Sequence, residues 1–324
     1  MARARRRITA PRFDPTFGDL ALATARQDLI VGRWQGARDL LRDTGRDWDR
    51  RTHRVRLLAD VAAGTRTVET WQAAEPQNPD ALVLRAETEV MRIFAAVGEA
   101  NRAQGSPPPP TEDSIDRSHL DRAARICLQA ADRHPADPVP WVSLMTLARL
   151  YGGGHPHVWH WWRELQARDT YSREGHHQVL RHLSERWHGS HGEMYNFARD
   201  SAAFAPVGTP LAALTQTARA EHYRQRITVE GPTAVGLTYH WTHEVAVQAL
   251  HATMRDWISH RAGMEYAQDV ADLNTVLHGL AFAGMKEQAR EVNRQLGNRP
   301  TRAPWSYSGD PEHLFDHWRA HLAD

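Results

Sequence analysis

The sequence has little cysteine and almost no lysine. Among its 324 residues there is one cysteine, Cys127, and one lysine, Lys286. A single cysteine excludes an intramolecular disulfide and any thiolate cluster, which fits a protein of a reducing compartment. Nearly all of the 40 basic residues are therefore arginine, a bias that codon usage alone can produce. The number of arginines is for this reason weak evidence for phosphate binding.

Long apolar runs are also missing. No segment approaches the roughly 18 uninterrupted apolar residues of a membrane-spanning helix. The basic start, MARARRR, is not followed by the apolar stretch that a secretory signal requires. We therefore expect a cytoplasmic protein without a membrane segment, and we interpret the basic start as a frayed, solvated arm.

Neither sign of charge is in excess. The 40 lysine and arginine residues balance 39 aspartate and glutamate residues, which gives a formal net charge of +1. Proteins that bind nucleic acid through its phosphates need a concentrated basic surface. The balance of charge over the chain therefore argues against nucleic acid as a partner.

The motifs of several common enzyme classes are absent. The sequence contains no phosphate-binding loop ending in Gly-Lys-Ser/Thr, no Gly-x-Gly-x-x-Gly, no Gly-x-Ser-x-Gly and no paired-cysteine site. We therefore expect no cofactor and assign no metal site. These absences lower the expectation of an enzyme but leave room for an unfamiliar active site.

Helical periodicity runs through almost the whole sequence. Apolar residues recur at spacings of three and four, as in Leu22, Ala25 and Leu29, and no convincing alternation typical of a strand occurs. Many short amphipathic segments with short connections predict an all-α protein of stacked helix pairs. We expect about 14 or 15 helices.

Two segments repeat at an offset of 57 residues: WQAAEPQNPDALVL at 71–84 and LQAADRHPADPVPW at 128–141. They share Gln-Ala-Ala, a turn containing proline with asparagine or aspartate, and a new apolar helix. Looser copies are FARDSAAFAPVGTPLAAL at 197–214 and AGMKEQAREVNRQLG at 283–297. Internal repetition of this kind is typical of arrays of helical hairpins.

A small residue at the turn, an alanine five positions later and the proline-containing junction resemble degenerate tetratricopeptide (TPR) repeats. The phrases HHQVLRHLSERWHGSHGEMYNFAR, APVGTPLAAL and GMKEQAREV are also similar to a group of bacterial TPR-like proteins. The resemblance covers roughly residues 19–300. It implies an α-solenoid that serves as a scaffold or recognition surface, and it supplies no catalytic residues.

The segment 101–118, NRAQGSPPPPTEDSIDRS, interrupts the helices. Four consecutive prolines lack amide hydrogens and fix φ, so we interpret it as an extended linker. It separates N-terminal helical repeats at 16–100, preceded by the basic arm at 1–15, from a His- and Trp-rich part at 119–324 that ends in a capping helix. A second interruption, RITVEGPTAVG at 226–236, predicts a loop folded over one face.

Histidine is unusually frequent, with 20 residues concentrated after position 150. In HPHVWHWW, His157 and His160 are three residues apart and can share a helix face beside Trp161. A metal would need a further ligand from elsewhere, so we interpret this group as part of an aromatic and polar core or groove. One of His176, His177 and His182, on a helix expected at about 172–187, could face His240 across a concave surface.

The segment 238–262 is expected to form one long helix. At about 100° per residue, His240, Glu244 and His251 fall on one side of it. A rise of about 1.5 Å per residue separates His240 from His251 by about 16 Å, so these two cannot share a metal ion. Only His240 with Glu244, or His240 with His243, could act together. A His–Glu pair could serve as an oriented general base.

The string HGSHGE at 188–193 could hold a nucleophile, but its spacing is that of a helix start. Ser190 followed three residues later by Glu193 is a capping box. Met194 and Ala198 then follow on one apolar face. We therefore predict that Ser190 begins a helix rather than carrying out a reaction.

Two functions are compatible with these patterns. The first is a non-catalytic, TPR-like scaffold that binds a protein or peptide segment in its concave groove. The second is an enzyme or small-molecule-binding protein with His240 and Glu244 as its acid–base pair. Neither the partner nor the oligomeric state can be assigned from the sequence. The groove candidates are His157, His160, Trp161, His177, His240, His243, Glu244 and His251.

Overall fold

The computed structural model describes residues 13–103 and 116–322, and within these ranges it contains α-helices and short 3-10 helices but no strand. This confirms the all-α class. Eight α-helices lie before residue 170: α1 (Leu20–Ile30), α2 (Gln35–Thr44), α3 (Trp48–Ala62), α4 (Thr67–Ala74), α5 (Pro79–Ala103), α6 (Arg117–Arg133), α7 (Val139–Ala148) and α8 (Val158–Arg168). Seven follow: α9 (Arg173–His182), α10 (His191–Phe204), α11 (Leu214–Glu230), α12 (Glu244–Asp256), α13 (Asp269–Phe282), α14 (Lys286–Leu296) and α15 (Pro311–His321).

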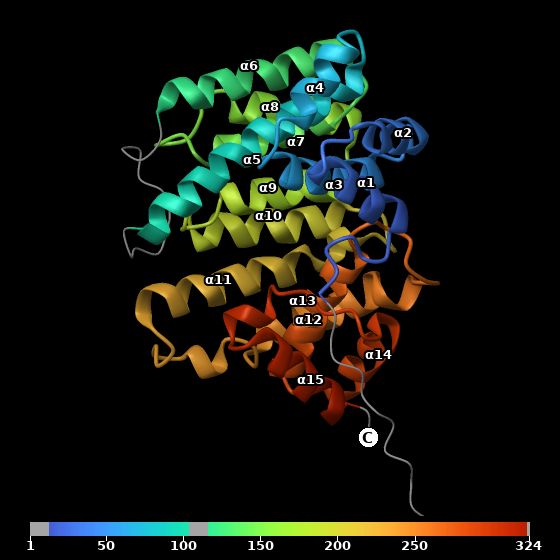
Figure 1. Cartoon of the computed structure of the whole chain (residues 1–324). Coiled ribbons are helices and arrows are strands. Elements are labelled where there is room, and N and C mark those ends of the chain that lie inside the picture. The colour runs from blue at the N-terminus through green and yellow to red at the C-terminus, as the bar shows by residue number, and fades with distance from the viewer. Residues whose placement is uncertain (1–12, 104–115, 323–324) are drawn as a thin grey trace, which may run out of the picture.

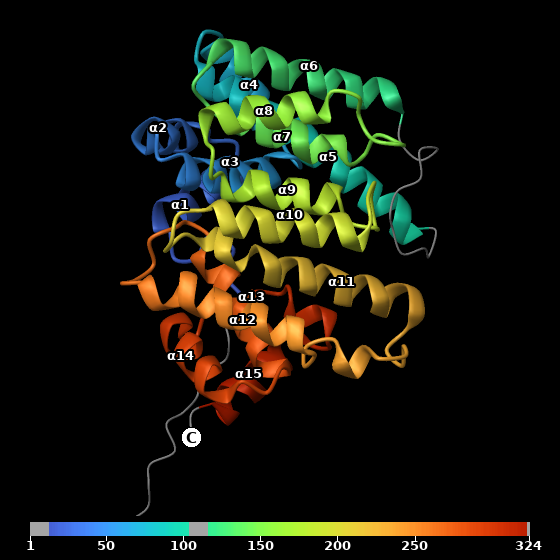
Figure 2. The same ribbon diagram turned by 180° about the vertical axis from the view of Figure 1, so that it is seen from behind.

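Helices that are neighbours in the sequence pack against each other, as α1 does on α2, α6 on α7, α10 on α11 and α13 on α14. The stack runs from α6 at the top of Figure 1, through α9, α10 and α11, to α15 at the bottom. Figure 2 shows the same order from behind. This arrangement is compatible with a helical repeat fold. None of the described helices has both the length and the apolar character needed to cross a membrane.

The hydrophobic core is divided into two large clusters. One extends from Leu22 to Val179 and the other from Ala212 to Leu322. The first contains residues on both sides of the proline-rich segment, because α5 and α6 pack along each other. The two cores therefore meet near α9 to α11 and not at that segment. Its four prolines, like the basic arm up to residue 12, lie outside the described residues.

The first helices also contact the C-terminal half directly. Phe17 packs against the second core cluster, and the carboxylate of Asp49 in α3 accepts a hydrogen bond of 2.6 Å from the amide of Ala267. The guanidinium of Arg302 lies 5.2 Å from the ring of Phe13. In Figure 1, the segment that leads into α1 accordingly runs beside the C-terminal helices. These contacts join segments that an open superhelix would hold apart.

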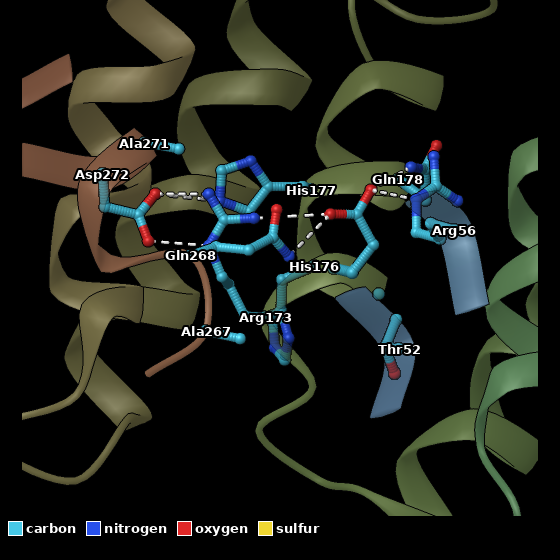
Figure 3. A network of polar contacts seen from close by, with 12 residues as sticks. Thr52, Arg56, Arg173, His176, His177, Gln178, Ala267, Gln268, Ala271 and Asp272 are labelled. Atoms are coloured by element: carbon cyan, nitrogen blue, oxygen red, sulfur yellow. Dashed lines mark hydrogen bonds and ion pairs between the residues drawn. The ribbon is translucent and has the colours of Figure 1, made fainter. Parts of the chain in front are cut away.

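A buried network of charges connects the two halves (Figure 3). Arg173 of α9 donates to both carboxylate oxygens of Asp272 in α13, at 2.6 and 2.5 Å. The neighbouring Glu174 accepts a 2.5 Å hydrogen bond from Gln178 and lies 3.5 Å from Arg56 of α3. Each charge of this network thus faces a charge of opposite sign, as the cost of removing ions from water requires.

Two expectations about the region before α12 are wrong. Arg226 and Glu230 form an ion pair one helical turn apart, and α11 continues through them, so the loop expected at 226–236 begins only at residue 231. The helix expected at 238–262 is broken into a 3-10 turn (Leu237–Tyr239), α12 and a second 3-10 turn (Ile258–His260). The break lets Trp241 pack on Tyr223 and His278, a tertiary contact that helical periodicity does not reveal.

The helix start predicted at Ser190 is confirmed. The Ser190 hydroxyl accepts a hydrogen bond from the Glu193 amide at 3.2 Å and donates to the Glu193 carboxylate at 2.8 Å. Met194 and Ala198 of the same helix are fully buried. The His-Gly-Ser-His string therefore begins α10.

We expect Ser190→Ala to lower the free energy of unfolding by about 1 kcal/mol, because the Glu193 amide at the start of α10 loses its acceptor. Urea denaturation followed by circular dichroism measures this change. Ser190→Asp, which restores an acceptor at the same position, should recover most of the loss. Equal stability of Ser190→Ala and the unmodified protein would contradict the capping role.

Candidate functional site

A pocket of about 780 Å³ lies between α10, α11, α12 and the segment that leads into α12. We call it the α10–α12 pocket. Its volume falls within the range of about 300–1,000 Å³ that is typical of small-molecule sites. The helices contribute Tyr195, Arg199, Ala202 and Ala203 (α10), Thr215, Arg219, His222 and Arg226 (α11), and Val245, Gln248, Ala249, Ala252, Arg255 and Asp256 (α12).

Small side chains explain why the three helices leave a hollow. The lining residues of each helix recur at spacings of three and four, so each helix presents one face to the pocket. Ala202, Ala249 and Ala252 stand where larger side chains would fill the space. The helices are held in place by other faces, where Met194 and Leu250 are fully buried. The wall of the pocket is thus largely apolar, and its shape is determined by the packing of buried residues outside the pocket.

One end of the pocket is polar. Arg219 donates through Nη1 to the His240 carbonyl at 3.0 Å and to His243 Nε2 at 2.7 Å, and His240 Nε2 lies 2.9 Å from the Arg219 carbonyl. The Tyr195 hydroxyl lies 3.1 Å from His222 Nδ1. These contacts join α10 and α11 to the turn before α12. They also fix the positions of the two histidines that precede α12.

The hydrogen bonds determine the protonation of these histidines. Because a carbonyl can only accept, His240 carries its proton on Nε2, and because arginine can only donate, His243 accepts through Nε2 and is neutral. Burial, with neighbouring charges, lowers the pKa of His240 to about 4 and that of His222 to about 3. Burial raises the pKa of Tyr195 to about 12. None of these three groups titrates near neutral pH, where general acid–base catalysis is most effective.

Arg219 is a buried cation without a carboxylate partner. Its side chain lies 5.4 Å from the ring of Tyr195, and the residue is only 5% exposed. Its Nε has no acceptor, and no carboxylate among the described residues forms an ion pair with it. In contrast, Arg226 is paired with Glu230, an acidic residue of the same helix. The pocket therefore holds an uncompensated positive charge at its polar end.

The structure brings only part of the predicted site together. His240 and His243 line the α10–α12 pocket. Glu244 is the first residue of α12, is exposed and accepts from Gln248 at 2.9 Å, and it does not line the pocket. His251 lies exposed on α12, also outside the lining. Since the helix begins after His240, the spacing expected to align His240 with Glu244 does not apply.

The other candidates lie elsewhere. His157 and His160 are exposed at the start of α8, where His160 meets the edge of Trp141 with ring centres 6.4 Å apart. Trp161 is buried in the first core cluster, and His177 is buried with its Nε2 3.8 Å from a carboxylate oxygen of Asp272. Burial lowers the pKa of His177 well below its usual value. None of these four residues lines the α10–α12 pocket.

Three residues of the polar end, Tyr195, Arg219 and His222, were not predicted from the sequence. A signal was present, since Arg219 and His222 belong to a row of polar residues on α11 that begins at Thr215 and ends at Arg226, with spacings of four, three and four. A row of this kind predicts one polar helix face but does not say what the face meets.

Comparison with known proteins does not identify the site: no protein-family model matches the chain, and curated proteins and solved structures give no significant match. In the described part of the chain, no three His, Cys, Asp or Glu side chains are placed to hold a metal ion together.

Proposed function

We propose that this chain is a non-catalytic binding protein that holds an apolar part of its ligand in the α10–α12 pocket. The observation that carries the proposal is the pocket of about 780 Å³, in which alanines of α10 and α12 form an apolar part of the wall. Pockets that combine apolar walls with a few convergent polar groups are typical ligand sites.

A peptide or protein segment is the ligand that we favour. Tyr239 and Val245 line the pocket and are also 70% and 64% exposed, so apolar surface continues from the pocket to the outside. A ligand longer than the pocket could therefore remain in contact with the protein beyond it. Stacked helical hairpins of the TPR-like type expected from the sequence commonly present such surfaces. The cytoplasmic location stays a prediction, with which the buried, unpaired Cys127 is compatible.

A binding role fits the polar end better than an acid–base reaction does. His240 is buried and bonded to a backbone carbonyl, whereas Glu244 is exposed and bonded to Gln248, so they do not form the pair that the alternative function requires. His240 and His222 stay neutral, and Tyr195 stays protonated, over the whole neutral pH range. They are suited to donating and accepting fixed hydrogen bonds.

Filling the pocket tests the proposal. We expect Ala252→Phe to weaken the binding of the neutral apolar dye Nile red by about tenfold or more, because the new ring occupies the space of the ligand. Fluorescence titration measures the affinity, and a thermal melt checks that the fold is kept.

The matched control is Ala167→Phe, which adds the same ring to an exposed position on α8. It should leave Nile red affinity unchanged. A partner peptide recovered by affinity capture should compete with the dye in the unmodified protein and not in Ala252→Phe. Unchanged dye affinity in Ala252→Phe would show that the pocket is not the binding site.

A further inference from the structure

The charge on Arg219 gives the pocket a chemical preference. Arginine has five N–H donors and remains protonated in proteins. Only Nη1 of Arg219 donates to described residues, namely to the His240 carbonyl and His243 Nε2, and the residue is 5% exposed. A cation this deeply buried is normally paired, because removing it from water is costly. We therefore expect the ligand to supply the negative charge that pairs with Arg219.

We propose that the ligand is an organic carboxylate with an apolar body. The carboxylate binds at Arg219, and the apolar body lies along the alanines of α10 and α12 that line the pocket. This inference rests on the proposed binding function of the α10–α12 pocket and adds the ligand class. A planar carboxylate matches the planar guanidinium, which forms strong charge-assisted hydrogen bonds to it.

The surroundings of Arg219 favour a single negative charge. His240 and His243 are neutral in their present hydrogen bonds, so Arg219 is the only buried cation at this end of the pocket. Arg226 is already matched by Glu230, and Arg255 by Asp256. Arg199 also lines the pocket, but it is exposed, so water compensates its charge. A phosphate dianion would leave one charge without a partner in this site. A carboxylate neutralises the guanidinium and leaves no excess.

The carboxylate could belong to a free organic acid or to the C-terminus of a peptide. Both present the same group on an apolar body, so the test includes both sources. The probes are octanoate with its neutral analogue octanol, octyl phosphate, and a short apolar peptide with either a free or an amidated C-terminus. Isothermal titration calorimetry at pH 7.5 measures each affinity for the full chain.

We expect at least one carboxylate probe to bind more tightly than its neutral analogue by about 10- to 100-fold, the range for a hydrogen bond to a charged group. Arg219→Met should remove this difference and leave the affinity for octanol unchanged. Arg224→Met is the matched control, because its guanidinium is on the same helix, is paired with Glu221 and lies outside the pocket lining, and it should retain the preference. Unchanged octanol binding also shows that Arg219→Met keeps the pocket folded.

The outcomes separate this inference from the proposed function. Tight octanoate binding identifies a free acid, and tight binding of the peptide only with a free C-terminus identifies a peptide end; either supports the inference. Equal binding of carboxylates and neutral analogues overturns the inference but leaves the binding function intact. Tighter binding of octyl phosphate than of octanoate also overturns it. If no probe binds, both the inference and the proposed function fail.

Discussion

Replacing Asp272 with alanine is expected to lower the free energy of unfolding by about 3–5 kcal/mol, the range measured when one partner of a buried ion pair is removed. Asp272 is 1% exposed, and both of its oxygens accept from Arg173. Without them the guanidinium of Arg173 would stay buried beside α13, with Glu174, at 3.3 Å, as its remaining ion-pair partner. Chemical denaturation at pH 7 measures the loss.

Asp272→Ala is expected to lower stability because Arg173 is charged in the folded protein. Burial on its own would lower the pKa of this guanidinium, but the charge and hydrogen bonds of Asp272 outweigh burial and raise it. The pair is therefore ionised, and the variant leaves a full charge behind. Exchanging both residues, as in Arg173→Met with Asp272→Leu, should recover most of the stability, because no unpaired charge remains.

An exposed ion pair provides the control. Glu287 and Arg290 lie one turn apart on α14, and Glu287 is largely exposed. Glu287→Ala should change stability by less than about 1 kcal/mol. A loss of the same small size in Asp272→Ala would contradict the role that we assign to the buried pair. The contrast matters for the fold because the Arg173–Asp272 pair connects α9 with α13, one on each side of the boundary between the two cores.

Much of the helical framework could be predicted from local signals. The start of α10 at Ser190 and the start of the last helix at Asp310 and Pro311 follow from residues that act on adjacent amides. The short 3-10 turn near His240 could not be predicted in this way. It depends on Trp241 packing against Tyr223 and His278, which are distant along the chain.

The pocket could be predicted only in part for the same reason. The frequency of histidine pointed to His240 and His243, which do line it. The polar row on α11 contains Arg219 but did not single it out, because arginine is abundant throughout this chain and the importance of Arg219 arises from its burial without a carboxylate. Burial and the identity of neighbours are properties of the tertiary arrangement. Residue spacing can show which side chains share a face, as on α11, but not which charges remain uncompensated.

Acidification from pH 7 to pH 5 is expected to destabilise the protein by about 4 kcal/mol or more, because several histidines are held neutral in the folded state. Burial lowers the pKa of His53 to about 4 and that of His278 to about 3. These two residues are 6% and 0% exposed. In the unfolded chain a histidine titrates near about 6.5. His182, His222 and His240 have pKa values lowered to about 4, 3 and 4 in the same way.

The direction follows from proton binding in the two states. Below about pH 6.5 the histidines of the unfolded chain bind protons, whereas the buried histidines of the folded protein stay neutral down to about pH 4. Unfolding is therefore favoured as the pH falls. The stabilisation is therefore complete above pH 6.5 and is lost progressively below it. Each such group contributes about 1.4 kcal/mol per pH unit, so His53 and His278 alone account for about 4 kcal/mol at pH 5. Buried carboxyl groups with raised pKa values, such as that of Glu221, act in the opposite direction. They offset part of the contributions of His182, His222 and His240.

Urea denaturation at several pH values between 7 and 5 measures this dependence, and single variants assign it. His53→Phe removes one titrating group from the core, so the slope of unfolding free energy against pH should fall by about one proton, whatever the variant does to absolute stability. His251→Gln, at an exposed position on α12, should leave the slope unchanged. A slope that His53→Phe left unchanged would mean that a buried histidine of this kind is charged in the folded state. The donor and acceptor roles assigned to His240 and His243, on which the single charge at Arg219 depends, would then have to be revised as well.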